Sequence, residues 1–422
     1  MAPKLIKPHL LFISPMLPSP NGPGLAMRPY YQLVNLSRIY SIHLLVAGTT
    51  AGRPAYDGNI NKYCENIDYI CRYRFSGWKF SIWHRICSLN DNLKHFIKGN
   101  DLTFIADSGD SNHLRRDKTL TMIAHMKFER VHVYRLFLTP LAKTLKKNGL
   151  DSFYSLDIDD IESETRRSIS NLFSGNGEFT QASKLKKEAE IYFNIEKKNI
   201  PEYDQIFVCS HLDRNTLQNR FPDKVISVLP NVVPIPKNAK KHLINKVFTM
   251  LFVGTLGYYP NIDALLFFAN QIVPIIKEKS RQPWELRVAG ALQENKWIDQ
   301  LKKYPEIKFT GWVKDLYREY EMADIVITPI RGGGGTRIKI LEAFAHQVPV
   351  VSTSKGAEGL DVENGKHLII EDDARHFAEA CIRLMTDKLL VDEISGRALE
   401  LATSKYCPEI IKQAWTQIPH TN

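Results

Sequence analysis

A run of glycines followed by a charged but otherwise apolar segment is the part of the sequence best suited to chemistry. Residues 332–335 are consecutive glycines; an apolar strand pattern over 324–328 precedes them, and a helical pattern containing Arg337, Lys339 and Glu342 follows. Glycine lets the backbone turn sharply and approach a ligand, and the amide N–H groups that begin a helix form an anion site favoured by the helix dipole. We therefore predict a phosphate-binding loop between a strand and a helix. Its predicted ligand-binding residues are Arg331, Gly333, Gly334, Gly335, Thr336, Arg337, Lys339 and Glu342.

The charges in this stretch support the prediction. Arg337 and Lys339 fall near the first helical turn, where each cation opposes the helix dipole by about 0.3–1 kcal/mol unless an anion binds nearby. Glu342 lies among apolar residues on a helix that is hydrophobic on nearly every face, so its carboxylate needs a partner. The simpler alternative is a flexible glycine loop in which Lys339 pairs with Glu342 at the i,i+3 spacing.

A sheet must position these residues, and the sequence predicts one in each half of the chain. Short β-rich runs alternate with longer amphipathic segments, which is typical of an α/β fold with parallel strands and crossover helices. The proline-containing segment 230–236 and the polar, lysine-rich residues up to 246 predict a linker between two domains. The predicted strands are residues 9–14, 42–47, 68–75, 130–136, 153–158, 205–209 and 225–229, then 248–253, 285–289, 308–310, 324–328, 348–351 and 367–370.

Composition narrows the class of protein further. The 422 residues are 44% hydrophobic, enough for two domains with large cores, and the net charge of +10 favours an anionic partner. No apolar run approaches the roughly 20 residues that span a bilayer, and no secretory leader is visible, which predicts a cytoplasmic protein. The six cysteines form no Cys-x-x-Cys pair, and neither they nor the histidines show metal-ligand or catalytic-triad spacing.

Several short motifs in the second half resemble one enzyme family. They include Phe-Val-Gly-Thr-Leu at 252–256, Phe-Thr-Gly-Trp-Val at 309–313, Leu-Glu-Ala at 341–343 and Pro-Val-Val at 349–351. In order and approximate spacing the sequence resembles the GT-B glycosyltransferases, specifically the retaining family 4 or group 1 transferases, over about residues 246–390. The resemblance implies two facing Rossmann-like domains, an acceptor-binding domain over 1–234 and a donor-binding domain over 235–404, with 405–422 packing back onto the first.

The resemblance also implies an activity. Such enzymes transfer a sugar from a nucleotide-sugar donor, here UDP-, GDP- or TDP-linked, to a hydroxyl of a saccharide or lipid-linked saccharide, with retention and without a further cofactor or a required metal. It points to bacterial surface glycan or glycolipid synthesis. By the same resemblance Glu342 binds the ribose hydroxyls, backbone groups from Gly311 to Val313 contact the base, and Gly254 and Thr255 lie in a donor-binding loop.

Two departures from the family pattern concern the donor site. The family's Glu-x7-Glu pattern places a first glutamate eight residues before Glu342, where this chain has Gly334, so the usual contact with a sugar hydroxyl is missing or replaced. Residues 254–261 lack the Arg or Lys that many relatives use as a phosphate ligand. We therefore assign the diphosphate to Arg337 and Lys339.

An acidic strand end in the first half gives the candidate catalytic residues, Asp157 and Asp159. Strand alternation predicts that both carboxylates lie on one face, where like charges raise one another's pKa or share a cation. One interpretation is a carboxylate that orients or deprotonates the acceptor hydroxyl, which we favour; another is an Asp-x-Asp metal site of the GT-A kind. The third is an acidic helix start in which Asp159, Asp160 and Glu162 cap backbone amides.

Two further segments of the first half are candidates for ligand contacts. The proline-rich loop over 14–24 corresponds to a glycine loop of the relatives, so Gly22, Gly24 and Arg28 are predicted to lie against the donor phosphates. Residues 71–98 mix basic and aromatic side chains, which predicts either binding to an anionic membrane surface, at the inner face of the plasma membrane, or amphipathic core packing.

Three other functions fit some of these features. A sugar-nucleotide epimerase uses the same fold, a pseudoenzyme would bind the donor without turnover, and a basic protein can bind nucleic acid. No nucleic-acid-binding motif is visible, which makes the last alternative the weakest.

Overall fold

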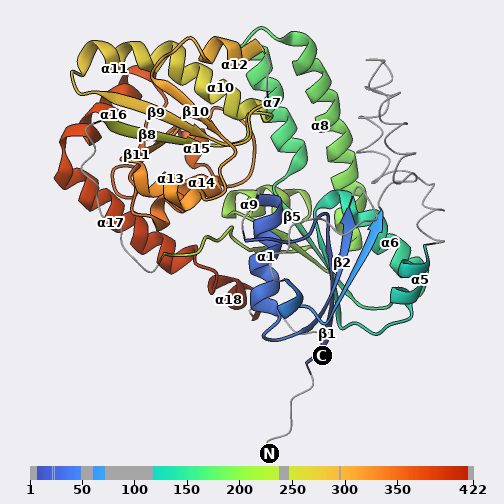
Figure 1. The fold of residues 1–422 in the computed structure, drawn as a ribbon. Coiled ribbons are helices and arrows are strands. Elements are labelled where there is room, and N and C mark those ends of the chain that lie inside the picture. Colours follow the sequence, from blue (N-terminus) through green and yellow to red (C-terminus); the bar gives the residue numbers. More distant parts are fainter. Residues whose placement is uncertain are drawn as a thin grey trace, which may run out of the picture. The chain divides into compact units, whose positions relative to one another are not determined.

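The chain forms two compact units, each built around one parallel sheet (Figure 1). The computed structural model describes residues 7–20, 22, 24–48, 60–71, 117–236, 247–293 and 296–416. The first unit comprises Met1–Ser163, Lys187–Pro230 and Ile411–Asn422, and the second comprises Glu164–Lys186 and Asn231–Ile410. This division differs from the predicted domains mainly at residues 164–186, which we placed in the first domain.

The first unit contains a seven-stranded sheet in the order β3-β2-β1-β4-β5-β6-β7. Every strand pair is parallel, and each predicted strand of this half is present within a few residues of its predicted ends. Its strands are β1 (His9–Ser14), β2 (Ser41–Gly48), β3 (Asn66–Cys71), β4 (Arg130–Tyr134), β5 (Phe153–Asp159), β6 (Gln205–Val208) and β7 (Val225–Val228). Its helices are α1 (Gly24–Leu36), η1 (Ile60–Lys62), α5 (Lys118–Ala124), η2 (Leu136–Leu138), α6 (Thr139–Lys147), η3 (Ile200–Glu202), α9 (His211–Arg220) and α18 (Ile410–Thr416).

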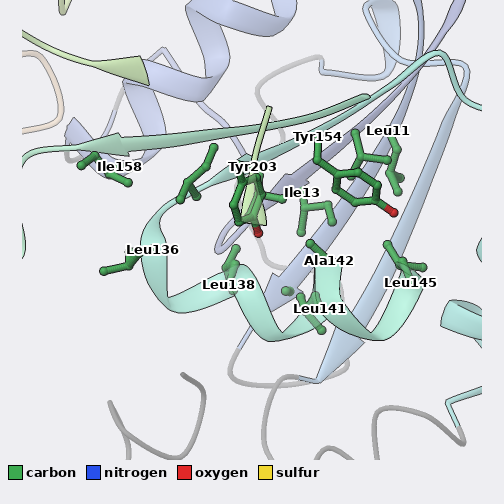
Figure 2. Close-up of a cluster of buried hydrophobic side chains, with 14 of the residues drawn as sticks. Leu11, Ile13, Leu136, Leu138, Leu141, Ala142, Leu145, Tyr154, Ile158 and Tyr203 are labelled. Carbon is green, nitrogen blue, oxygen red and sulfur yellow. The ribbon is translucent and has the colours of Figure 1, made fainter. Parts of the chain in front are cut away.

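Both faces of this sheet are buried, which explains why its strands are almost continuously apolar. On one face, Leu11, Ile13 and Tyr154 pack on Leu141 and Leu145 of α6 (Figure 2). On the other face lie the alternate residues of the same strands, which contact the C-terminal helix. Trp415 of α18 stacks on Phe207 at 5.0 Å between ring centroids and lies 5.0 Å from His132. Helix α18 therefore completes the first unit.

The second unit contains a six-stranded parallel sheet in the order β10-β9-β8-β11-β12-β13. Renumbered from its first strand, this is the order 3-2-1-4-5-6 of a doubly wound nucleotide-binding sheet. Its strands are β8 (Phe248–Val253), β9 (Trp284–Ala289), β10 (Ile307–Gly311), β11 (Ile325–Thr328), β12 (Val350–Ser352) and β13 (Ile369–Ile370). Its helices are α10 (Tyr259–Phe267), η4 (Phe268–Ile272), α11 (Val273–Lys279), α12 (Lys296–Leu301), α13 (Leu316–Met322), α14 (Ile338–Ala345), α15 (Ser354–Ala357), α16 (Ala374–Thr386) and α17 (Lys388–Lys405).

Alternate residues of each strand enter two separate cores of the second unit. Met250 and Phe252 of β8 face the core that includes α10, α11 and α16, whereas Leu251 between them faces the core that includes α13, α14 and α17. This period of two is what a sheet covered on both faces requires. The α/β class with two Rossmann-like domains is therefore confirmed.

Two long helices belong to both units. Helix α7 (Glu162–Gly175) begins in the first unit and enters the second at Glu164, and α8 (Phe179–Asn199) returns to the first at Lys187. Within the second unit the end of α7 packs on the start of α8, because Ser170 Oγ donates to the Ala182 carbonyl at 2.7 Å. Among the described residues, no helix has the length and apolar character needed to cross a membrane.

Candidate functional site

The predicted phosphate loop lies at the point of the second sheet where the strand order reverses. Strands β8 and β11 are neighbours there, and ligands of doubly wound sheets bind outside the carboxyl ends of such strands. Backbone hydrogen bonds join the adjacent strand ends, from Gly254 N to Ala289 O and from Gly290 N to Gly311 O, both at 2.9 Å. A Cβ at Gly290 would lie 2.2 Å from the Gly254 carbonyl oxygen, so this close approach requires glycine. Gly290 is not among the site residues predicted from the sequence.

Arg337 holds the glycine loop in shape. It is the N-cap residue of α14, and its guanidinium turns back to donate to the carbonyls of Gly334 and Gly335 and, at 3.3 Å, to that of Gly332. Gly333 has φ of 100°, a conformation that disfavours other residues. The predicted loop residues therefore come together, and Arg337 is bound to the loop backbone itself.

Lys339 joins this loop to the loop after β8. Its Nζ donates to Asn261 Oδ1 at 3.0 Å and lies 4.3 Å from the centre of the Phe252 ring. Asn261 in turn donates to the Thr255 carbonyl at 2.9 Å. Burial, followed by the nearby charge of Arg337, lowers the pKa of Lys339 to about 7. Gly254, Thr255 and Lys339, which come from two distant motifs, thus lie together around Asn261.

Glu342 lies one turn further along α14. Tyr320 donates its hydroxyl to Glu342 Oε2 at 2.7 Å, and His346 stacks on the Tyr320 ring at 5.1 Å. Burial raises the pKa of Glu342 to about 7, against the opposing effects of the Tyr320 hydrogen bond and the Lys339 charge. The partner that a half-buried carboxylate needs is therefore Tyr320. The alternative in which Lys339 pairs with Glu342 does not match these hydrogen bonds. Lys339 donates to Asn261, and Glu342 accepts from Tyr320.

Two residues predicted for this site point elsewhere. Arg331 forms a two-bond ion pair with Asp263, at 3.0 and 2.7 Å, and its guanidinium lies over Phe267. It lines a pocket of about 370 Å³ formed by α10, α12 and the α7–α8 turn. Thr336 accepts a hydrogen bond from Asn231 at 2.9 Å. Arg331 is thus committed to a buried carboxylate, a pairing that the sequence separation of 68 residues gave no means to predict.

The segment predicted to contact a nucleobase follows β10. Gly311 has φ of 70°, and Val313 packs against the core that contains α14. Between them the Trp312 side chain is 67% exposed. The strand therefore ends in a sharp turn that leaves backbone groups at the carboxyl edge of the sheet.

In the first unit, Asp157 lies in a buried ion pair with Arg28. Arg28 donates to both carboxylate oxygens at 2.9 and 3.0 Å, and Gln32 donates to Oδ2 at 2.6 Å. Asp157 has no exposed surface, and Arg28 is 4% exposed. The arrangement provides no contact between Asp157 and an acceptor, and it directs Arg28 to a carboxylate instead of a donor phosphate. The proline-rich loop leaves Gly22 exposed and reaches α1 at Gly24.

Asp159 occupies a different setting, although it also belongs to this network. The pairing with β6 shifts register between Asp157 and Asp159, and Asp159 has φ of 63°, so strict strand alternation ends there. Its carboxylate accepts from Arg135 at 3.1 Å and lies 3.7 Å from Arg28. Burial raises the pKa of Asp159, and the two arginines oppose this shift. The two aspartates therefore share a cation, one of the outcomes that their spacing predicts.

Arg135 organises the rest of the acidic stretch. It follows β4 with φ of 84° and donates to Asp160 at 2.9 Å and to Glu162 at 2.6 Å. Arg135 is not among the residues predicted from the sequence, because its partners lie about 25 residues away along the chain. Residues 72–98 of the proposed membrane-binding segment lie outside the described residues.

Part of the second unit matches a known protein family. Residues 247–387 match the family model described as glycosyl transferases group 1. The matched range includes the loop after β8, the turn after β10 and the whole of the glycine loop with α14. These are the elements that carry the candidate site.

Two curated relatives resemble parts of the chain. An uncharacterized 44.6 kDa protein in the cps region of Klebsiella pneumoniae is 28% identical over 165 residues, 37% of this chain and 42% of that protein. An exopolysaccharide phosphotransferase of Streptomyces coelicolor is 24% identical over 201 residues, 46% of this chain and 20% of that protein. The chain therefore spans less than half the length of either relative.

Solved structures resemble nearly the whole chain in fold. Sucrose-phosphate synthase from Thermosynechococcus elongatus is 12% identical with a TM-score of 0.65, covering 97% of this chain and 98% of that one. Anabaena HepE, in complex with UDP and glucose, is 12% identical with a TM-score of 0.62 over 97% and 98%. TarM of S. aureus, in complex with UDP among other ligands, is 13% identical with a TM-score of 0.62 over 97% and 99%. Residues 247–387 therefore resemble the glycosyl transferases group 1 family, and nearly the whole chain shares the fold of these solved structures, as the sequence resemblance implies.

Proposed function

We propose that the protein is a glycosyltransferase that moves a sugar from a nucleotide-sugar donor to an acceptor hydroxyl with retention of anomeric configuration. The observation that carries the proposal is the gathering of Arg337, Lys339 and Glu342 at the carboxyl edge of the second sheet. Two cations near the start of a helix are unfavourable unless an anion binds beside them. A nucleoside diphosphate supplies that anion.

Each part of the donor has a candidate partner in the second unit. Lys339 offers its charge to the diphosphate next to the amides that begin α14, while Arg337 keeps the glycine loop in the shape that exposes this edge. Glu342 accepts from the ribose hydroxyls. Backbone groups from Gly311 to Val313 contact the base. UDP is the first nucleotide to test, because two structures of similar fold were solved with it. GDP and TDP are the alternatives.

In this reaction the main task of the protein is to stabilise the leaving group. When the bond between the anomeric carbon and the diphosphate oxygen breaks, negative charge grows on that oxygen, and fixed cations and backbone amides offset it. The acceptor oxygen forms the new bond, and its proton passes to the departing phosphate. Asp159, whose side chain is 18% exposed, orients the acceptor hydroxyl, whereas the fully buried Asp157 keeps a structural ion pair. No resident cofactor or metal enters this scheme.

The acceptor we propose is a saccharide or lipid-linked saccharide of a bacterial surface glycan. The support is that the two curated relatives are named for a cps region and for exopolysaccharide chemistry.

The test is calorimetric binding of UDP, GDP, TDP and ADP to the wild-type protein and to Arg337→Ala. Loss of the guanidinium removes the charged hydrogen bonds that hold the loop in shape and a positive charge beside the diphosphate, so binding of the preferred nucleotide should weaken by about 1.5–3 kcal/mol. Arg383→Ala is the matched control, since the Arg383 side chain is 63% exposed on α16. Equal affinity in wild type and Arg337→Ala would reject the assignment.

Turnover separates the proposal from its alternatives. Transfer from the preferred nucleotide sugar to an acceptor, with the product anomer read by NMR, supports a retaining transferase. Interconversion of the free nucleotide sugar without acceptor would indicate an epimerase instead. Binding without either reaction would indicate a pseudoenzyme, and salt-sensitive retention of RNA or DNA a nucleic-acid binder.

A further inference from the structure

The glycine loop rests on a helix that lies far from it in the sequence. Ser168 of α7 accepts a hydrogen bond from the Gly333 amide at 3.1 Å across a separation of 165 residues. A Cβ added to Gly332 would lie 2.3 Å from Leu172 Cδ1 and 3.4 Å from the Ser168 carbonyl oxygen. The loop backbone therefore lies directly against one face of α7, and glycine at 332 is what permits this approach.

The peptide unit between Gly332 and Gly333 is held at both of its polar ends. Its carbonyl accepts from Arg337 Nη2 at 3.3 Å, and its N–H donates to Ser168 Oγ. Because a peptide unit is planar, fixing both groups fixes its orientation and opposes a flip of the loop. The other side of Gly333 is closed by Tyr258, whose hydroxyl would lie 2.7 Å from an added Cβ.

Helix α7 is itself firmly attached within the second unit. Phe173 stacks on Tyr259 of α10 with ring centroids 3.6 Å apart, and Ile169 and Phe173 pack with Ala182 of α8. Asn176, just past the end of α7, donates to Asp263 of α10 at 2.7 Å. The helix therefore offers the loop a supported surface, and Ser168 and Leu172 are the side chains that face the loop.

We infer that Ser168 and Leu172 are positioning residues for the donor-phosphate loop. They act through Gly332 and Gly333 and set where the backbone of the loop lies relative to Arg337. This inference rests on the proposed function for its consequence, which is tighter binding of a nucleoside diphosphate, but the positioning itself can be measured without any ligand.

The first experiment measures amide exchange at Gly333 by NMR on glycine-labelled protein, with UDP binding measured in parallel. In Ser168→Ala the Gly333 amide loses its acceptor, so its exchange should accelerate and the Kd for UDP should rise about 3- to 10-fold, the effect of one hydrogen bond. Ser168→Thr keeps the hydroxyl and should restore both. Ser174→Ala, on the exposed part of the same helix, should change neither.

The second experiment uses the steric contact. Gly332→Ala alone should weaken UDP binding, because its Cβ meets Leu172; combining it with Leu172→Ala removes the colliding atoms and should recover affinity to within about threefold of wild type. Unchanged Gly333 exchange in Ser168→Ala, or a double variant no better than Gly332→Ala, would overturn the inference. If the wild type binds none of the nucleotides while Ser168→Ala still accelerates exchange, the donor assignment fails and the positioning stands.

Discussion

Lys339 and Glu342 lie on one short helix, and the pKa of each side chain is shifted to near neutral pH. Burial lowers the pKa of the lysine to about 7 and raises that of the glutamate to about 7, so at neutral pH both groups are easily charged or discharged. An anion bound beside them favours the charged lysine. Binding of a nucleotide is therefore expected to depend on pH through these side chains.

We predict that UDP binds more weakly as pH rises from about 6 to 8.5. In the free protein Lys339 is protonated below its pKa of about 7 and neutral above it, so binding at high pH must take up a proton. One coupled proton changes affinity by at most about tenfold per pH unit. Calorimetry on the wild type and on Lys339→Met checks this, because the titration of UDP itself is common to both. A parallel pH profile in the variant would exclude Lys339 as the group responsible.

The two aspartates at the end of β5 should respond differently to removal of charge. If Asp159 orients the acceptor hydroxyl as we propose, Asp159→Asn is expected to lower turnover about 10-fold or more, because it weakens that charged hydrogen bond. Asp157→Asn should mainly lower the urea midpoint, because Asp157 is fully buried against Arg28 and Gln32. Rates at saturating donor and acceptor, together with urea titrations, distinguish the two. Full turnover in Asp159→Asn would leave the acidic stretch with a structural role only.

At the scale of elements, the Arg28–Asp157 pair fastens α1 to β5 in the first unit. The two residues lie 129 positions apart, and both are almost completely buried. Replacing one partner leaves a buried charge without compensation, which is far more costly than loss of an exposed pair. The pair therefore stabilises the first unit only as long as both members are present.

Arg28→Met should destabilise the protein by about 3–5 kcal/mol, the usual cost of breaking a buried ion pair from one side. Arg28→Met combined with Asp157→Leu should recover much of that loss. The control is Arg397→Met, because the Arg397–Glu393 pair on α17 has side chains 46% and 54% exposed and should contribute less than about 1 kcal/mol. Urea unfolding measures all three. A double variant as unstable as Arg28→Met would contradict the explanation.

The elements were more predictable than the contacts between them. Alternation and apolar runs located the strands because a sheet buried on both faces imposes continuous hydrophobic segments, and glycines marked the loop after β11 because few other residues fit there. Local patterns carry no information on which distant residue satisfies a charge. Hence the sequence predicted Lys339 and Glu342 as site residues but could not identify Asn261 and Tyr320 as their partners, or Asp263 as the partner of Arg331.

At the scale of the whole molecule, neither unit is a continuous piece of chain. Residues 164–186 lie in the second unit although they precede its first strand by more than 60 positions, and they contribute Ser168, Leu172 and Phe173 to its packing. A boundary drawn in the predicted linker would therefore remove part of the second unit. The structure explains why a division by sequence alone misplaces this segment.

We predict that a fragment of residues 231–410 is less stable than one in which residues 164–186 are joined to it. Without α7 the fragment exposes Tyr259 and Trp297, which otherwise pack with Phe173 and Ile169. Thermal unfolding of the two fragments, with circular dichroism to compare helix content, measures the difference. Equal melting temperatures would show that α7 contributes nothing to the second unit. A second fragment carrying Phe173→Ala in the joined segment serves as the control for specific packing.

The return of the chain to its first unit has a consequence for synthesis on the ribosome. Trp415 covers Phe207 and His132 of the first sheet, but it follows the whole of the second unit in the chain and is translated after it. The first unit is therefore completed only after the second has been synthesised. Until then, one apolar face of its sheet remains exposed. A stop codon placed just before α18 should therefore damage the fold of the first unit, and chaperone dependence should be greatest for its earliest strands.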